Sequence, residues 1–356
     1  RLRDVSAHVV VLGAGLAGTA AARSIAARGH RVTVLERFET GHRRGSSHGQ
    51  ERIFRLSYEE PEYVRLGLDA LDGWRALERE TGASILHPVG MLDHGDPERL
   101  DALERTCRDQ GVPIARIDAA VAAANWPGFT FESDVLLQPE AGWLAADRAI
   151  AAFTMLAERD GASFRYGRAA RAVESVGAGW RVTTGDGPLD ADVLVVTTAG
   201  WTPDLLGPML AAVVELPPIR VTVETVAYFR PRGDAAWPCW CHRLDPEVYG
   251  LPSPDGLVKV AEHGAGPEAH PDERAFEPTP DALARLEAYV DRWLPGVEPG
   301  AVRSATCLYA STPTDDFVLD RSGSFVLGVG LGGHGFKFGP AIGDRLAGLV
   351  DAALDR

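Results

Sequence analysis

The sequence predicts an α/β fold, α+β overall, in which a doubly wound, largely parallel sheet is joined to a second, mainly antiparallel β-sheet. Three features predict this arrangement: a strand–turn–helix–strand unit at the start of the chain, a strand-rich middle, and a second glycine-rich turn near the end. With 356 residues, the chain is long enough for two domains.

The first feature opens with the apolar run Val9–Leu12, which is typical of a buried parallel strand. Gly13, Gly15 and Gly18 follow as G-x-G-x-x-G at the point where a helix must begin. Such a turn lets a pyrophosphate approach the backbone at the positive end of the helix dipole. The unit therefore predicts a Rossmann-like site for an ADP-ribose moiety rather than an ordinary glycine turn.

A second strand and an acidic residue complete this unit. Gly29 is suited to end the helix, and Arg31–Leu35 is the second strand. Glu36 ends that strand 18 positions after Gly18 (36 − 18 = 18), where a carboxylate binds ribose hydroxyls. The motif alone does not distinguish NAD from FAD.

Composition narrows the class of protein. The net charge of −14 (36 basic and 50 acidic residues) argues against nucleic-acid binding. No apolar run reaches the roughly 18 residues that would span a bilayer, and no secretory signal is visible. Four cysteines in this length do not suggest a disulfide framework. We therefore expect no membrane partner and a reducing, cytoplasmic location.

Hydrophobic periodicity and turn residues predict the remaining elements. Helices are expected over residues 63–81, 97–110, 147–160 and 279–294. Strands are expected over residues 135–138, 163–166, 169–176, 180–184, 192–197, 219–229, 247–251, 257–263, 302–309, 317–319 and 324–329. Thr279 with Pro280 is a typical helix start, and the residues around 177–179 form a hairpin turn.

Two further turns follow strands, and at each of them the backbone could approach a ligand closely. Ala199 and Gly200 follow one strand, and a glycine-rich stretch from Gly328 to Gly335 leads into the last helix. An NAD dehydrogenase would more often keep its six Rossmann strands contiguous, so this arrangement favours FAD. We expect the FAD-binding domain to comprise residues 1–88, 142–215 and 304–356, and the substrate domain residues 89–141 and 216–303.

Two cations stand in the polar segment that follows the first unit. Arg52 and Arg55 are three residues apart, so they would share a face on a helical turn. The segment is either a solvated basic loop or a pair of cations facing an anionic ligand, and the residues alone do not decide between these.

Five motifs in order resemble one family over nearly the whole chain. They are GAGLAG (13–18), GSSHGQERIFR (45–55), LVKVAEH (257–263), CLY followed by DDF (307–309 and 315–317), and GGHGFKF (332–338). On these motifs the chain resembles the D-amino-acid-oxidase-type FAD-dependent oxidoreductases, in particular their monomeric sarcosine oxidase and N-methyl-tryptophan oxidase branch.

The resemblance implies FAD, held covalently by Cys307 through a thioether to the 8α-methyl of the flavin. A thiol is a suitable nucleophile for that bond, although most free cysteines are merely small buried residues. The positions expected to bind FAD are Gly13, Gly15, Leu16, Ala17, Gly18, Glu36, Arg37, Ser46, His48, Arg52, Val173, Ala199, Gly200, Trp201, Cys307, Gly332, Gly333, Gly335, Phe336 and Lys337.

The resemblance also assigns roles to side chains around the flavin. Arg55 and Lys337 match the pair that binds the substrate carboxylate, and Lys259 matches a lysine that assists reaction with oxygen. An ammonium at that place would stabilise the negative charge formed on dioxygen. The other catalytic positions are Arg52, His263, Tyr309 and Tyr249.

The implied reaction is oxidation of the C–N bond of a secondary amine, an N-methyl or cyclic amino or imino acid, to an imine. Dioxygen is reduced to hydrogen peroxide, and we expect a monomer that needs no metal. The alternative is a flavin dehydrogenase or desaturase that acts on a cyclic amine in specialised metabolism. A non-catalytic flavin-binding subunit would have no need of Arg55, Lys337, Lys259 and Cys307 together.

Three departures from the family pattern put sarcosine itself in doubt. Glu51 replaces a small hydroxyl residue, and Glu262 replaces an aromatic one. Each carboxylate would neutralise an arginine, hold a substrate cation or point into solvent. Residues 237–241 (WPCWC) align with a substrate-lining stretch and are bulkier than expected. Two thiols and the adjacent His242 make a poor tetrahedral metal set.

Overall fold

The computed structural model describes residues 6–213 and 216–355. Its first sheet has six strands in the order β19-β20-β13-β1-β2-β9, and every neighbouring pair is parallel except β19 with β20. The strands are β1 (His8–Leu12), β2 (Arg31–Leu35), β9 (Ser163–Arg165), β13 (Val193–Val196), β19 (Val318–Ser322) and β20 (Phe325–Val329).

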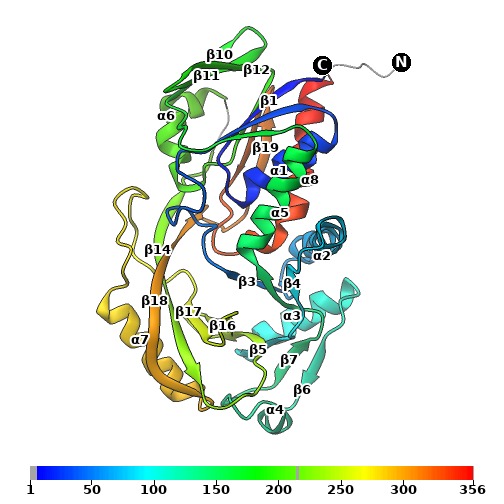
Figure 1. The fold of residues 1–356 in the computed structure, drawn as a ribbon. Helices are drawn as coiled ribbons and strands as arrows, with labels where there is room; N and C mark the ends of the chain where they lie inside the picture. The colour runs from blue at the N-terminus through cyan, green and yellow to red at the C-terminus, as the bar shows by residue number, and fades with distance from the viewer. Residues whose placement is uncertain (1–5, 214–215, 356) are drawn as a thin grey trace.

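Strand alternation gives this sheet two buried faces. Val9 and Val11 of β1 face one cluster of helices, whereas Val10 and Leu12 face a small sheet on the other side. The helices are α1 (Leu16–Ala27), α2 (Pro61–Thr81), α5 (Ala146–Arg159) and α8 (Gly339–Leu354). The small antiparallel sheet contains β10 (Ala172–Val176), β11 (Gly179–Thr184) and β12 (Gly187–Ala191). These elements form the three layers in the upper part of Figure 1.

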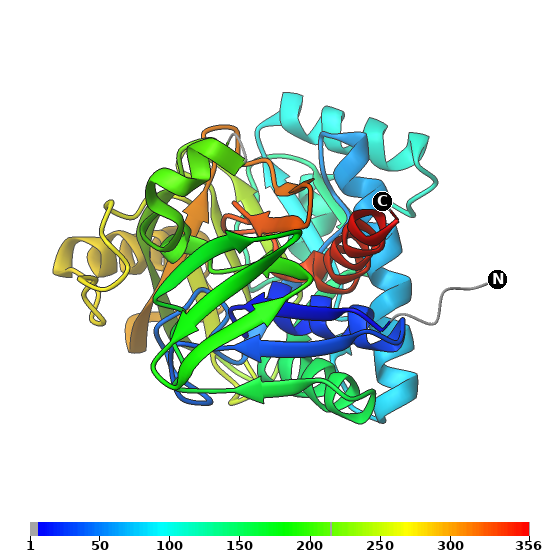
Figure 2. The same ribbon diagram turned by 90° about the horizontal axis from the view of Figure 1, so that it is seen from above.

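The first and last helices lie side by side in this layer (Figure 2). A Cβ added at Gly343 of α8 would lie 2.6 Å from the backbone oxygen of Ala20 in α1. Only glycine permits such a close approach of two helix backbones. The two ends of the chain are thereby joined in one core.

The second sheet has eight strands in the order β18-β14-β17-β16-β15-β5-β7-β6, and only β15 with β5 is a parallel pair. Its strands are β5 (Met91–Gly95), β6 (Ala115–Ile117), β7 (Val135–Gln138), β14 (Arg220–Pro231), β15 (Cys239–Arg243), β16 (Val248–Pro252), β17 (Val258–Glu262) and β18 (Val297–Ser311). The long strands β14 and β18 run from the upper part of the molecule into the lower part (Figure 1).

Helices and a small third sheet complete the structure. The third sheet has the order β3-β8-β4, formed by β3 (Glu51–Phe54), β4 (Leu86–His87) and β8 (Gly142–Ala145). The remaining helical elements are α3 (Pro97–Asp109), α4 (Ala119–Asn125), α6 (Thr202–Val213), α7 (Pro280–Trp293) and the 3₁₀ turns η1 (Ala199–Trp201) and η2 (Phe336–Phe338). None of the helices within residues 6–213 and 216–355 combines the length and apolar character needed to cross a bilayer.

The predicted fold class is confirmed, and most predicted elements agree with the structure to within a few residues. The expected N-cap at Thr279 accepts a hydrogen bond from the backbone N–H of Ala282 at 3.3 Å. Several short strands were not predicted, among them β3, β5 and β15. The two-domain division stays a prediction, although the segments assigned to the substrate domain supply most of the eight-stranded sheet.

Candidate active site

A cavity of about 1470 Å³ is lined by the ends of the parallel strands and by the eight-stranded sheet. Most of the predicted site residues line it, from both ends and the middle of the chain. They are Gly13, Gly15, Leu16, Ala17, Glu36, Arg37, Ser46, His48, Arg52, Arg55, Ala199, Trp201, Tyr249, Lys259, His263, Cys307, Tyr309, Gly332, Gly333, Gly335, Phe336 and Lys337.

Three predicted cofactor positions do not line the cavity. Gly18 lies behind the turn, where an added Cβ would be 1.8 Å from the Gly13 carbonyl oxygen, so it serves close packing of helix and strand. Val173 is packed in the core between β10 and the large parallel sheet, and residues 169–171 line the cavity in its place. Gly200 packs against Val221, whereas its neighbour Ala199 reaches the cavity.

The glycine turn is held against the end of β2. Gly13 adopts φ +99°, and its N–H donates to the Leu35 carbonyl at 2.8 Å. Gly15 is the N-cap of α1 and has no side chain to cap it, so this helix end opens toward the cavity. Glu36 is buried and accepts hydrogen bonds from the N–H groups of Ala14 at 2.9 Å and Phe38 at 3.0 Å. The turn and the carboxylate therefore form one preformed unit.

Arg52 is fixed by three backbone carbonyls rather than by a carboxylate. Its guanidinium donates to the carbonyls of Glu51 at 2.8 Å, Ser46 at 3.0 Å and His48 at 2.5 Å. Burial and the neighbouring Arg52 lower the pKa of His48 to about 4, although its hydrogen bond to the Gly45 carbonyl opposes them. His48 is therefore neutral at pH 7, and Arg52 keeps an uncompensated positive charge at the cavity wall.

Arg55 and Lys337 both contact Tyr58. The Arg55 guanidinium carbon lies 4.0 Å from the centroid of the Tyr58 ring, and the Lys337 amino group donates to the Tyr58 hydroxyl at 3.0 Å. Lys337 also donates to the His334 carbonyl at 2.9 Å, and Arg55 donates to the Ser57 carbonyl. Burial, together with Arg55, holds the pKa of Lys337 well below its usual range. Within the described residues, neither cation has a carboxylate within ion-pair distance.

A row of three polar rings lies along the β16–β18 side of the cavity. The Tyr309 hydroxyl is 3.4 Å from the Tyr249 hydroxyl and 3.5 Å from His263 Nδ1. Burial lowers the pKa of His263, although Glu247 raises it. The neutral imidazole is therefore available to exchange hydrogen bonds with a ligand.

Cys307 and Lys259 lie on the strands that face the glycine turn. Burial raises the pKa of the Cys307 thiol, and the nearby Arg52 and Lys259 lower it. The Lys259 amino group is 3.4 Å from Glu51 Oε1. Glu51 is fully buried and so does not point into solvent, and its ion-pair partner in the described chain is Lys259 rather than an arginine.

The other two departures from the family pattern lie away from the cavity. Glu262 pairs with Arg285 of α7 at 2.7 Å. Trp237 and Trp240 pack in the core beneath the eight-stranded sheet, and from residues 237–241 only Cys241 lines the cavity. Cys239 and Cys241 lie in one core cluster. His242, the residue after Cys241 in β15, packs instead against Tyr289 and Trp293. The two thiols and His242 therefore do not converge.

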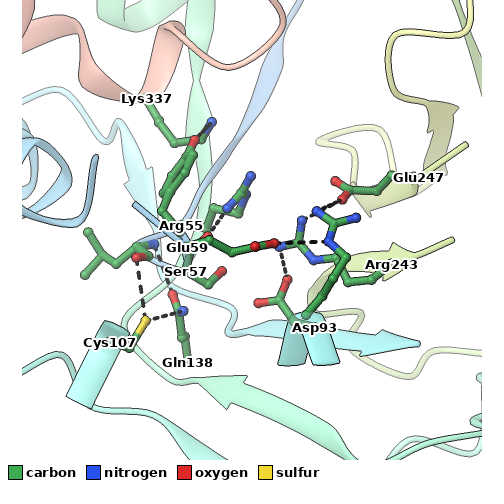
Figure 3. Close-up of polar contacts among 12 residues, drawn as sticks. Arg55, Ser57, Glu59, Asp93, Cys107, Gln138, Arg243, Glu247 and Lys337 are labelled. Carbon is green, nitrogen blue, oxygen red and sulfur yellow. Dashed lines mark hydrogen bonds and ion pairs between the residues drawn. The ribbon is translucent and has the colours of Figure 1, made fainter. Parts of the chain in front are cut away.

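Sequence reasoning missed a buried ion-pair cluster beside Arg55 and Lys337. Arg243 pairs with Asp93 and with Glu247, the latter at 2.6 Å (Figure 3). Burial opposes ionisation of Glu247, but Arg243 and Arg55 outweigh it and hold its pKa at about 2. Glu247, Tyr249 and Leu251 all line the cavity, so strand alternation from the predicted Tyr249 would have found Glu247.

Comparison with known proteins identifies the family. The model of the family described as FAD dependent oxidoreductase matches residues 8–349. The chain belongs to this family.

Curated relatives and solved structures agree with that assignment. A monomeric sarcosine oxidase of Streptomyces avermitilis is 31% identical over 96% of this chain and 93% of its own. An N-methyl-L-tryptophan oxidase of Yersinia pestis is 26% identical over 95% of this chain and 93% of its own. The structure of NikD, an unusual amino acid oxidase essential for nikkomycin biosynthesis, matches with a TM-score of 0.85 and 28% identity, covering 96% of this chain and 93% of that one.

The cavity suits the dinucleotide of this FAD-dependent family. The N-terminus of α1, a turn without side chains at Gly13 and Gly15, and the buried Glu36 meet at one end; Ser47 Oγ accepts from the Leu16 N–H of this helix end at 3.1 Å. A Cβ at Gly15 would lie 3.1 Å from Ser47 Oγ, so a side chain would close the cradle. Cys307 and Tyr309 line the same cavity, so they could contact the FAD bound there.

We expect Glu247→Gln to destabilise the protein in a pH-dependent way. A carboxyl whose pKa is about 2 when folded and about 4.3 when unfolded stabilises the fold above pH 5 and loses that stabilisation as the pH falls toward 2. The difference in unfolding free energy between wild type and variant should shrink by roughly 1.5–2 kcal/mol between pH 7 and pH 3, measured by urea unfolding.

Glu262→Gln is the matched control, since it breaks an ion pair whose arginine side chain is 49% exposed. It should change stability by less than about 1 kcal/mol at either pH. A Glu247→Gln difference that stays constant between pH 7 and pH 3 would contradict the buried ion pair.

Proposed function

We propose that this protein oxidises the C–N bond of a secondary amine, an N-methyl or cyclic amino or imino acid, to an imine. The observation that carries the proposal is the placement of basic side chains without a carboxylate partner in the cavity. Arg52, Arg55 and Lys337 have no carboxylate within ion-pair distance in the described chain. Lys337 is only 6% exposed, and a charge buried there without a partner is costly. A bound anion would supply the missing negative charge.

Arg55 and Lys337 are the proposed carboxylate-binding pair. A guanidinium fork with a second cation matches a planar carboxylate, and the two groups flank one aromatic ring. Because the direct partners of Lys337 are neutral, a carboxylate arriving beside it would favour its ammonium form. The charge of the substrate thus completes the site and holds the amino acid in one orientation.

His263, Tyr309 and Tyr249 are proposed to place the amine nitrogen. Their hydroxyls and the neutral imidazole offer acceptors at 3.4–3.5 Å spacing, which suits an amine that has already lost its extra proton. Bound FAD supplies the redox chemistry of this family, accepting a hydride from the carbon next to nitrogen and passing the electrons on. Hydrolysis of the imine follows in water.

Dioxygen is the proposed electron acceptor, with hydrogen peroxide as product, and Lys259 is the proposed group that assists its reduction. An ammonium in a water-poor site stabilises developing negative charge more strongly than it would in water. Arg52 of β3 also lines the cavity and supports the same charge. Cys307 is the proposed point of covalent FAD attachment, and its neighbours Arg52 and Lys259 favour the thiolate that such a bond requires.

The substrate is proposed to be larger than sarcosine. The side chains that support this are Cys241 and Glu247, which line the cavity, rather than Glu262 and the tryptophans that the sequence suggested. Glu262 and the tryptophans at 237 and 240 face away from the cavity and so do not restrict it. Cys241 and Glu247 do line it, and both lie near Arg55. These two side chains are therefore proposed to contact the substituent of the amino acid.

A flavin dehydrogenase or desaturase acting on a cyclic amine is the second candidate. The observation in its favour is the carboxylate of Glu51, which lies 3.4 Å from Lys259 and offsets part of its charge. Such an enzyme would be reduced by the same amines but would pass its electrons to an acceptor other than dioxygen.

An anaerobic titration tests the proposed function. Sarcosine, N-methyl-L-tryptophan, L-proline and L-pipecolate are mixed with the purified yellow protein, and flavin absorbance is followed. At least one amine should bleach the flavin, and admitted air should restore the colour with one peroxide per amine oxidised. If no secondary amino acid bleaches the flavin, the proposal is wrong; rapid bleaching with slow reoxidation supports the dehydrogenase.

Cys307→Ala tests the covalent attachment. Denatured wild-type protein should carry the added mass of FAD, and the denatured variant should release it, because no other thiol replaces Cys307 in the cavity next to Arg52 and Lys259. Cys241→Ala serves as the control and should retain the bound mass. Flavin that stays attached in Cys307→Ala would disprove the link.

Substitution of each lysine of the cavity should affect a different step, either binding of a carboxylate ligand or reoxidation of the flavin. Lys337→Met should weaken binding of cyclopentanecarboxylate, a carbocyclic analogue of proline, at least tenfold. The reason is the loss of a hydrogen bond to a charged group, which contributes about 1.5–3 kcal/mol. Lys259→Met should bind this analogue within twofold of wild type but reoxidise far more slowly. The readouts are the flavin spectral change on titration and stopped-flow mixing with oxygen. Equal effects of both variants on binding would refute the assignment.

A further inference from the structure

The chain contains two lysines among its 36 basic residues, Lys259 and Lys337, and both line the same cavity. Arginine supplies every other basic side chain (36 − 2 = 34). An arginine stays charged when buried, whereas a lysine can lose its proton. Where the molecule uses lysine, the protonation state of the amine therefore depends on what surrounds it.

The surroundings of Lys259 mostly disfavour its charge. Lys259 on β17 is 6% exposed and lies opposite Tyr228 in the β14–β17 ladder. Burial lowers the pKa of Lys259 most strongly, Arg52 lowers it further, and Glu51 raises it. The other titratable groups around it are the Cys307 thiol and the neutral His48. Glu51 is thus the one carboxylate within ion-pair distance of this amine in the described chain.

Glu51 is built into the wall of the cavity. It is 0% exposed and opens β3, whose pairing with Ala145 of β8 fixes its backbone. The Tyr228 hydroxyl donates to Glu51 Oε1 at 2.8 Å, the same oxygen that lies 3.4 Å from the Lys259 amino group. Glu51 Oε2 is buried without a hydrogen-bond partner in the described residues. Asp147 of α5 and Arg52 are the other charges that face it.

A carboxylate in such a place is costly. An ionised oxygen that is buried and unpartnered destabilises the fold by an amount that one ion pair does not fully return. Glu51 sits one residue before Arg52, so it also reduces the positive charge of the cavity. These costs are explained if the Glu51 carboxylate is needed to keep the neighbouring Lys259 amine protonated.

We propose that Glu51 is a positioning residue for Lys259, whose buried amino group it keeps protonated and fixed against Tyr228 at the cavity wall. Without the carboxylate, the amine would face Arg52 across a water-poor site and would shed its proton. The benefit to dioxygen reduction rests on the proposed function, but the protonation of Lys259 does not. The two can therefore be tested separately.

Lysine labelled with ¹³C at Cε gives two side-chain signals in the holoenzyme, assigned with Lys337→Met. Their pH titration reports the protonation of each amine directly. Glu51→Gln, which keeps the shape of the side chain, should move the Lys259 midpoint down by at least one pH unit and leave the Lys337 midpoint in place. Glu262→Gln, a carboxylate change on the same strand as Lys259 but paired with Arg285, should move neither.

An unmoved Lys259 midpoint in Glu51→Gln would overturn the inference. Tyr228→Phe provides an independent variant, since it keeps both charges but removes the hydrogen bond that holds Glu51 Oε1. It should shift the same midpoint in the same direction by a smaller amount, and no shift, or a shift upward, would count against the proposal.

Reoxidation kinetics then separate this inference from the proposed function. If Glu51 acts through Lys259, reoxidation of Glu51→Gln should fall with rising pH at a midpoint that matches the shifted Lys259 signal. Normal reoxidation of Lys259→Met would refute the oxygen role and leave the pairing intact. Slow reoxidation of Lys259→Met with an unmoved signal in Glu51→Gln would refute the pairing and leave the oxygen role intact.

Discussion

The parallel pairing of β1 with β2, β13 and β20 is the constraint on which the site depends. Carboxyl ends of parallel strands meet at one edge of a sheet, so segments far apart in the sequence are brought together there. The glycine turn follows β1, Glu36 follows β2, Ala199 follows β13, and the stretch leading to Lys337 follows β20. Every one of these segments lines the cavity. The close packing of α1 on α8 then locks the two chain ends together behind it.

The eight-stranded sheet supplies the opposite wall and most of the chemistry. Its strands carry Lys259, Cys307 and Tyr309 on adjacent ladders. The pairing is regular over this stretch, so alternation puts the three side chains on one face. Four of the basic side chains that line the cavity differ in their direct partners. Arg52 is bound by carbonyls and Lys259 by a carboxylate, whereas Arg55 and Lys337 have only neutral direct partners. Arg55 and Lys337 thus lack a negative partner, and the carboxylate of the proposed substrate would supply it.

The sequence predicted the parts of this site that depend on local pattern. The turn at Gly13, the carboxylate at Glu36 and the long amphipathic helix α2 follow from spacing alone, and the resemblance placed Lys259 and Lys337 in one cavity. It did not predict the partners of Glu51 or Glu247, because those depend on which strands become neighbours. It also did not predict that the side chain of Val173 packs in the core, two positions beyond the residues that line the cavity. The sequence aligned the tryptophans at 237 and 240 with a substrate-lining stretch, but both pack in the core, Trp240 from within β15 and Trp237 from the segment before it.

The lysine distribution also determines how this molecule can be probed from outside. Its surface cations are guanidinium groups, and both side-chain amines are enclosed where solvent reaches them little. Reagents that acylate primary amines therefore find no side-chain target on the exterior of the folded chain. Acylation at either lysine would require the interior to open. The rate of acylation by an ordinary amine-labelling reagent would therefore measure how often the cavity opens to solvent.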